Sequence, residues 1–327
     1  MRAATPGAAT SRARRRGARR GAADVIVLAL ILAAAAGAAW LLRDPAPTIL
    51  DRRGSLVAAY EDTLELADSH YVQVVRLRSS SGLTVSMTTK RHVADSGARL
   101  PLALLLGGRN TGQDAVRLLE NTRGVMAVAL SYPYAGDPKP KGAGVIRAIP
   151  QVRQAFFDTP AALMLALDDL LARPDVDSSQ VEAIGVSLGV PFVIIASALD
   201  SRVTRVWALH GSGGTFTPLV YSLREIIPSA PARFLAASIG TLAMSGPRIT
   251  PERWVGRISP RPFIMINAAD DERLPKEAVL SLFRAAREPK ELMWLPGAHV
   301  ASDADVVRPL VDMVMARITA RREGQFR

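Results

Sequence analysis

The stretch VEAIGVSLGVPFVIIASAL, residues 181–199, decides the fold because its character changes around a single serine. Residues 181–186 form a short apolar run, and residues 190–199 form a second apolar segment, long enough for a buried helix. Ser187 stands between them, with a glycine two positions away on each side. The pattern predicts a strand, a sharp turn at Ser187 and a helix.

Short apolar runs recur along the chain and alternate with longer segments of helical character. They are LPLALLLGG (100–108), GVMAVALSYP (124–133), VEAIGVS (181–187), VTRVWALHG (203–211), PFIMINAAD (262–270) and KELMWLPG (290–297). Runs without polar alternation suit strands that are buried on both faces, as in a parallel sheet covered by helices. Two β-rich runs, 71–79 and 82–91, flank a Ser/Gly turn and predict an antiparallel hairpin. We expect an α/β domain over residues 71–320, with a mostly parallel sheet, this hairpin at one edge and helices on both faces.

Two connections are informative. Residues 161–174 predict a helix that covers the sheet, with Asp158 or Thr159 as its N-cap and Pro160 in its first turn. Residues 211–261 are too long for a plain loop, so they are a candidate cap over a site, or else two ordinary surface helices. Four apolar residues of this insertion are candidates for an acyl pocket or for packing: Leu219, Tyr221, Ile226 and Phe234.

Composition excludes several classes of site. The chain has no cysteine, which excludes disulfides, thiolate metal sites and a cysteine nucleophile. Of its 41 lysines and arginines, seven arginines lie in residues 1–20, which leaves 34 basic against 30 acidic side chains in the rest. The remainder is only mildly basic and has no basic stripe interleaved with aromatic residues, so we expect no nucleic-acid partner.

The first 70 residues predict a membrane attachment. Residues 1–24 form a basic tail that should stay in the cytoplasm, and residues 25–42 contain no charge. These 18 residues span about 27 Å as a helix, enough for the hydrocarbon core, and predict a transmembrane signal anchor with the main domain on the extracytoplasmic side. A cleaved signal peptide, which would release a secreted domain, is the alternative. Residues 43–70 predict a linker and a short helix.

Serine is a weak nucleophile at neutral pH unless a base takes its proton and an acid orients that base. The chain has four histidines: His70, His92, His210 and His299. His299 lies in a glycine-containing loop after the last apolar run, where a base would reach Ser187, whereas His210 ends a core strand and is interpreted as structural. Asp270 and Asp271 follow the preceding run. The chain order is therefore serine, acid, histidine.

These segments resemble the α/β-hydrolase superfamily, nearest its esterase and dienelactone-hydrolase-like branch. GVSLG (185–189) resembles the nucleophile elbow, and SPRPFIMINAADDERLP (259–275) and LPGAHV (295–300) resemble the family segments that carry the acid and the histidine. The resemblance implies the α/β-hydrolase fold, with Asp271 rather than Asp270 as the triad acid. It also implies an oxyanion hole formed by the N–H groups of Leu188 and Arg109, with Gly108 as the alternative to Arg109.

Two departures from the family pattern bear on activity. Dienelactone hydrolases use a cysteine nucleophile, so Ser187 argues against that activity. Many members have His-Gly where this chain has Gly107-Gly108, which changes the loop expected to complete the oxyanion hole.

We therefore expect a serine hydrolase that uses Ser187, Asp271 and His299 to cleave a carboxylic ester or related acyl bond through an acyl-enzyme. It would need no metal and no organic cofactor, and its substrate would be a small-molecule or lipid-like acyl compound. A peptidase or an acyltransferase with the same triad is an alternative, as is a non-catalytic membrane-tethered binding protein. The sequence gives no indication of an oligomeric state.

Overall fold

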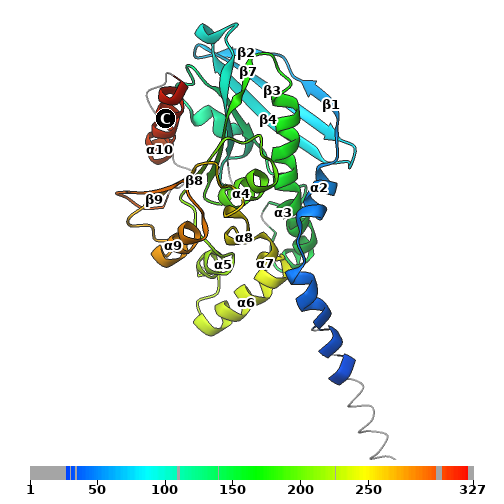
Figure 1. Cartoon of the computed structure of the whole chain (residues 1–327). Coiled ribbons are helices and arrows are strands. Elements are labelled where there is room, and N and C mark those ends of the chain that lie inside the picture. The colour runs from blue at the N-terminus through cyan, green and yellow to red at the C-terminus, as the bar shows by residue number, and fades with distance from the viewer. Residues whose placement is uncertain are drawn as a thin grey trace, which may run out of the picture. The chain divides into compact units, whose positions relative to one another are not determined.

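The computed structural model describes residues 27–29, 31–33, 35–108, 111–138, 140–224, 226–299 and 304–322 (Figure 1). The chain divides into two units, Met1–Asp44 and Pro45–Arg327, and the second is called the main unit below. In the first unit the described residues up to Leu42 are helical. The predicted basic tail and the first residues of the predicted anchor lie outside the described residues.

Among the described residues, no single helix is both long and apolar enough to cross a membrane. Two consecutive helices, Val27–Leu42 and Ala46–Arg53, meet that requirement only as a broken pair, by length and composition alone.

Ten strands form one sheet within the described part of the main unit. They are β1 (Leu56–Glu61), β2 (Glu65–Ala67), β3 (His70–Ser79), β4 (Thr84–His92), β5 (Leu100–Leu106), β6 (Met126–Leu130), β7 (Val176–Val186), β8 (Arg205–Leu209), β9 (Phe263–Ala268) and β10 (Lys290–Leu295). Their order is β1-β3-β4-β6-β5-β7-β8-β9-β10, and β2 pairs with β3. Pairing is parallel from β6 to β10 and antiparallel from β1 to β6. The mostly parallel sheet and the β3–β4 hairpin are therefore confirmed.

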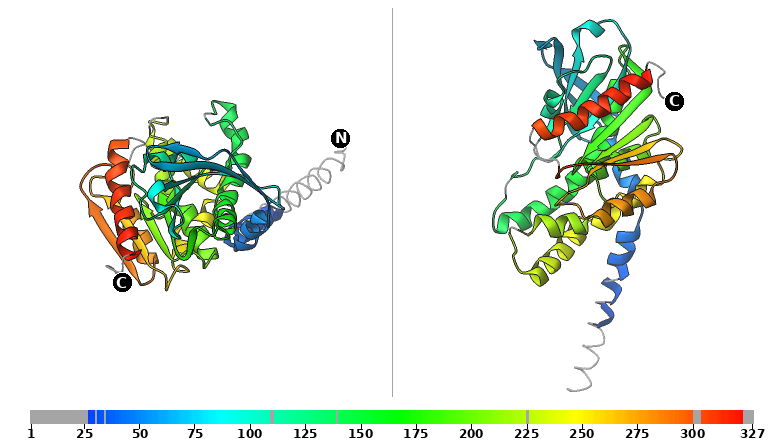
Figure 2. Two further views of the ribbon diagram at one scale, coloured as in Figure 1. Left: turned by 90° about the horizontal axis from the view of Figure 1, so that it is seen from above. Right: turned by 90° about the vertical axis from the view of Figure 1, so that its left-hand side faces the viewer.

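The sheet is covered on both faces (Figure 2). Its helices are α2 (Ala46–Arg53), α3 (Ala143–Leu170), α4 (Gly189–Leu199), α5 (Phe216–Ser222), α6 (Ala230–Ala243), α7 (Gly246–Ile249), α8 (Glu252–Val255), α9 (Lys276–Ala285) and α10 (Ala304–Arg322), with 3-10 turns η1 (Val93–Asp95) and η2 (Gly112–Leu118). Successive residues of the central strands point to opposite faces. In β5, Leu104 packs in the core shared with α3, α4, α8 and α9, and Leu105 in the core shared with η2 and α10.

The start of α3 differs from the prediction. The helix begins at Ala143, so Asp158, Thr159 and Pro160 lie in its interior rather than at its N-terminus. The Thr159 hydroxyl donates to the Ala155 carbonyl oxygen at 2.6 Å, and Asp158 forms an ion pair with Arg52. Both polar groups are therefore satisfied inside the helix, and the predicted caps were wrong.

The range 43–70, predicted as a linker and short helix, also contains β1 and β2. Both strands are largely exposed, and each pairs with β3. Exposed edge strands bury little apolar surface, so they lack the apolar pattern that identified the central strands.

Residues 211–261 contain α5 to α8, and the two halves of this insertion behave differently. Trp254 and Val255 in α8 are buried in the core with α4 and α9. In contrast, Phe234 and Ile226 are 61% and 75% exposed, so these two residues do not line an enclosed acyl pocket. The α7–α8 half thus belongs to the core, and the α5–α6 half lies outside it.

The turn from β7 to α4 requires glycine on both sides of Ser187. A Cβ on Gly185 would lie 2.7 Å from the Val190 Cα, and a Cβ on Gly189 would lie 2.1 Å from the Leu106 carbonyl oxygen. Both obstacles are backbone atoms, so neither can move aside without shifting a strand or a helix. The glycines therefore let β7, α4 and β5 approach closely.

We expect Gly189→Ala to lower the free energy of unfolding by about 1–3 kcal/mol or more, because the added methyl group overlaps the backbone of β5. Gly144→Ala is the matched control: it lies in α3, and its Cβ would meet only Pro140 at 3.7 Å. The control should change stability by no more than about 1 kcal/mol. Urea denaturation of the two variants measures the difference, and equal midpoints would contradict this account of the turn.

Candidate active site

Ser187 occupies a strained backbone position at the carboxyl end of β7. Its φ is +51°, a left-handed conformation that is uncommon for a residue other than glycine. The Ser187 N–H donates to the Leu209 carbonyl oxygen at 2.9 Å, and its carbonyl accepts from the Val190 N–H at 3.1 Å. These bonds fix the serine between β8 and the first turn of α4. Strain of this kind concentrates at functional sites.

His299 connects Ser187 to Asp271. The Ser187 Oγ lies 3.0 Å from His299 Nε2, and His299 Nδ1 lies 2.7 Å from Asp271 Oδ2. Both distances are those of hydrogen bonds. Asp271 follows β9 and His299 follows β10, so the carboxyl ends of three parallel strands bring the three side chains together. The structure thus places the three residues singled out from the sequence in one hydrogen-bonded row.

Asp271 is held from several sides. Its Oδ1 accepts the backbone N–H groups of Arg273 and Leu274, each at 2.8 Å. Burial opposes ionisation of Asp271, but polar contacts with His210 and His299 and these backbone bonds offset it and hold its pKa well below the ordinary value. The carboxylate therefore stays charged beside the imidazole.

Glu272 holds the loop that carries His299. One Glu272 carboxylate oxygen accepts the His299 backbone N–H at 2.9 Å, and this bond lowers the pKa of Glu272. The sequence reading did not single out Glu272, although it directly follows Asp271. The same short segment therefore orients the imidazole ring through Asp271 and the backbone of its loop through Glu272.

His210 lies closer to the site than its interpretation as a structural residue implied. It follows β8 with a φ of +50°, and its Nδ1 lies 3.7 Å from Asp271 Oδ2. Its ring meets the His299 ring edge-on, with centroids 5.3 Å apart. The Asn267 side-chain amide donates to the Gly211 carbonyl oxygen at 2.9 Å and fixes the backbone just after His210. The sequence carries one indication of this role: His210 directly follows the apolar run that forms β8, and β8 pairs with β7.

The same three side chains form the one cluster among the described residues that has the donor set of a metal site. One ligand atom from each of His210, Asp271 and His299 lies within 4.8 Å of the others. In the present arrangement His299 bonds both Ser187 and Asp271, so both of its ring nitrogens have partners.

The predicted oxyanion hole is described in part. Leu188 directly follows Ser187 and precedes the first residue of α4, so its N–H belongs to the elbow. Gly108 follows β5, and its carbonyl oxygen accepts the Thr111 backbone N–H at 3.2 Å and the Thr111 hydroxyl at 3.0 Å. Arg109 lies outside the described residues, so its place as a donor stays a prediction.

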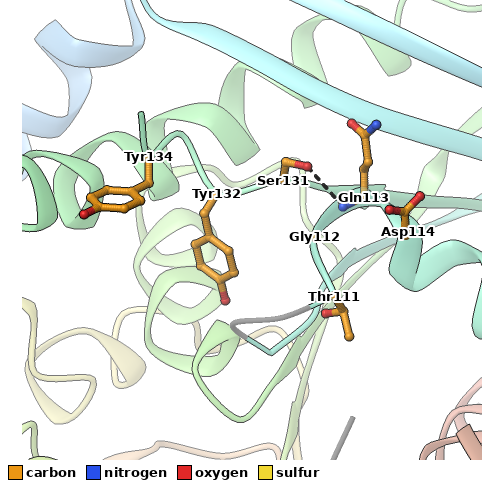
Figure 3. Close-up of a pocket in the computed structure, with 7 residues that line it drawn as sticks. All are labelled: Thr111, Gly112, Gln113, Asp114, Ser131, Tyr132 and Tyr134. Carbon is orange, nitrogen blue, oxygen red and sulfur yellow. Dashed lines mark hydrogen bonds between the residues drawn. The ribbon is translucent and has the colours of Figure 1, made fainter. Parts of the chain in front are cut away.

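A pocket of about 290 Å³ opens at the carboxyl ends of β5 and β6, the same sheet edge as Ser187 (Figure 3). It is lined by Thr111, Gly112, Gln113, Asp114, Ser131, Tyr132 and Tyr134. The Tyr132 hydroxyl donates to the Gly107 carbonyl oxygen at 2.7 Å, and burial raises its pKa, so it remains a proton donor. The Gln113 N–H donates to the Ser131 hydroxyl at 3.2 Å. The pocket wall is therefore tied to the loop that follows β5.

Known structures share this architecture. An acetyl xylan esterase from Paenibacillus sp. R4 matches with a TM-score of 0.62 at 16% identity, over 84% of this chain and 92% of that one. An acetyl xylan esterase from Thermoanaerobacterium sp. JW/SL YS485 matches with a TM-score of 0.57 at 14% identity, over 84% and 93%. A cold-adapted esterase from an Arctic intertidal metagenomic library gives 0.52 at 18%, over 79% and 99%. No protein-family model and no curated protein sequence matches the chain. At 14–18% identity, the likeness shows that the chain has the fold of these esterase structures, as the sequence predicted.

The lowered pKa of Asp271 predicts a pH-dependent contribution to stability. A carboxyl whose pKa is lower in the folded than in the unfolded chain stabilises the fold at pH values above its unfolded pKa, which is about 4. This contribution is lost as the pH falls from there towards the folded pKa. The difference in unfolding free energy between wild type and Asp271→Asn should therefore be constant above about pH 5 and shrink below about pH 4. Urea denaturation across this range measures it.

Asp270→Asn is the matched control, because Asp270 is the neighbouring carboxylate and is exposed. It should change the free energy of unfolding at pH 7 by about 0.5 kcal/mol or less. A difference between wild type and Asp271→Asn that does not change with pH would contradict the assigned electrostatics.

Proposed function

We propose that the chain is a serine hydrolase that cleaves a carboxylic ester through a covalent acyl-enzyme. The observation that carries the proposal is the hydrogen-bonded row in which His299 lies 3.0 Å from the Ser187 hydroxyl and 2.7 Å from Asp271. A nucleophile, a base and an acid that orients the base are the parts that acyl transfer requires.

The reaction proceeds in two steps. In the first, His299 Nε2 takes the Ser187 proton as Oγ attacks the ester carbonyl, and the protonated imidazole then gives that proton to the departing alcohol. In the second, His299 takes a proton from water, the hydroxide oxygen attacks the acyl carbon, and the carboxylic acid leaves as Ser187 regains its proton. The N–H groups of Leu188 and of Arg109 or Gly108 stabilise the oxyanion in both steps.

Asp271 makes the proton transfer effective because it stays ionised. Its carboxylate fixes the proton of neutral His299 on Nδ1, which leaves Nε2 free to accept the serine proton. It also stabilises the imidazolium that forms during attack. The two backbone N–H groups on the other carboxylate oxygen keep Asp271 from rotating away.

The substrate is proposed as a small ester. The solved structures with this fold that are compared above are acetyl xylan esterases and a cold-adapted esterase. The hydroxyl- and amide-lined pocket at the carboxyl ends of β5 and β6 has about 290 Å³, which suits a compact polar group rather than a long acyl chain.

We also propose that residues 25–42 are a signal anchor, with residues 1–24 in the cytoplasm and the main unit on the extracytoplasmic side. The support is the sequence: seven arginines precede an apolar stretch of 18 residues without charge. Cleavage of this segment would instead release the main unit as a secreted protein.

The nucleophile is tested by Ser187→Ala in the full chain. Wild type should react with a fluorophosphonate probe and hydrolyse short acyl esters, and Ser187→Ala should lose the labelling and at least about 10³-fold in kcat. Ser179→Ala is the matched control, because Ser179 lies in the same strand, β7, and is exposed. A folded wild-type chain that neither labels nor turns over any ester would support the binding-protein alternative.

His210 is proposed as a positioning residue that acts through Asp271. The His210 ring contacts both Asp271 and the His299 ring, so its loss would leave the Asp271–His299 pair less firmly placed relative to Ser187. We expect His210→Asn to lower kcat by about 10- to 100-fold, with little change in KM, because the base would be misplaced while substrate binding is retained. His92→Asn is the control, since His92 ends the β3–β4 hairpin. A rise in KM of similar size, or an unfolding midpoint that falls together with kcat, would indicate a structural role only.

A further inference from the structure

We propose that α6 and the first turn of α3 form a lipid-contact surface that seats the main unit on an anionic membrane. The proposal rests on the signal anchor proposed above for residues 25–42. It identifies the face of the main unit that contacts the bilayer.

An apolar stripe runs along the exposed side of α6. Leu235, Ile239 and Leu242 are spaced i, i+4 and i+7, which places them on one side of the helix, and they are 61%, 59% and 51% exposed. Phe234 beside them is 61% exposed. Single exposed apolar residues are ordinary, but a continuous stripe marks a surface that meets an apolar partner.

The first turn of α3 presents the same character. Ile146 is 71% and Val145 51% exposed. Figures 1 and 2 show α6 and the start of α3 at the same end of the main unit, the end at which α2 begins. The stripe on α6 and this turn are together called the apolar face below.

The length of the tether favours a membrane as the occupant. Residues 43–45 are all that separates the predicted anchor from α2, and three extended residues reach at most about 11 Å. If residues 25–42 span the bilayer, the end of the main unit at which α2 begins must lie close to the lipid surface. The apolar face lies at that end.

The charge around the apolar face suits anionic headgroups. Residues 138–157 contain four basic and no acidic side chains. Residues 214–250 contain Arg224, Arg233 and one glutamate in addition to Arg248, which is buried. Lys141 and Arg147, on either side of the first turn of α3, are exposed. Basic side chains beside an apolar surface are attracted to anionic lipid headgroups.

This face also adjoins the candidate active site along the chain. The insertion that carries α6 begins directly after His210, and Glu252 accepts the Gly214 backbone N–H at 2.9 Å, which ties its start to α8. Docking through α6 would therefore hold the segment next to the catalytic residues at the membrane surface.

The absence of cysteine from the sequence allows a direct test. Single variants Ile239→Cys and Ile146→Cys are made in the full chain, with Leu66→Cys in β2 as the control, because Leu66 is 69% exposed and lies at the other end of the main unit. Each is labelled with an environment-sensitive fluorophore and reconstituted into phosphatidylcholine–phosphatidylglycerol vesicles that carry a quencher on the lipid chains. Hydrolysis of a soluble short-chain ester is measured in the same samples.

We expect lipid quenching at positions 239 and 146 at least twofold stronger than at position 66, and weaker in vesicles without phosphatidylglycerol. No quenching at 239 and 146, or equal quenching at all three positions, would overturn the proposal. A fluorescence change at 239 that follows protein concentration rather than the quencher would assign the face to a second copy of the chain and also overturn it. If ester hydrolysis persists without quenching, only the lipid-contact proposal is rejected. If quenching occurs without hydrolysis, only the proposed hydrolase function is rejected.

Discussion

The left-handed backbone at Ser187 is the constraint on which the rest of the site depends. Gly185 allows β7 to pack against Val190 of α4, and Gly189 allows α4 to pack against Leu106 of β5. A relaxed backbone at Ser187 would require β7 and α4 to separate. The serine is therefore held out of the regular geometry of both elements. The energy that maintains this strain comes from the buried cores on both faces of the sheet.

A parallel sheet supplies the remaining geometry. The carboxyl ends of β7, β8, β9 and β10 lie at one edge, so residues far apart in sequence meet there without long loops. Asp271 and His299 follow adjacent strands, and the backbone of their loops is fixed by N–H groups bonded to Asp271 and Glu272. The order of the side chains around Ser187 is thus set by the order of strands.

The sequence predicted the parts of this arrangement that depend on uniform burial. Central strands buried on both faces have unbroken apolar runs, and the turn around Ser187 is marked by its glycines. The exposed strand β1 gave a weaker signal because it buries little apolar surface. Asp158 and Pro160 resembled a helix start, although they lie buried inside α3. The contact of His210 with Asp271 was not predicted, because His210 has a left-handed backbone that no local pattern of residues indicates.

The insertion after His210 combines two kinds of surface in one segment. Its second half, with Trp254, is part of the core, whereas α6 exposes an apolar stripe that contributes little to the stability of the main unit. Burial against lipid would give those residues the apolar environment that the main unit does not provide. Catalysis and membrane attachment would then be linked through the backbone that joins His210 to α6.

The most direct measurement of the central claim is mass spectrometry of the chain after brief reaction with an activated acetyl ester and an acid quench. One acetyl group is expected on the peptide that contains Ser187; it should form before hydrolysis and disappear as the ester is consumed. Ester consumption without an adduct on that peptide, or with an adduct on another residue, would contradict it.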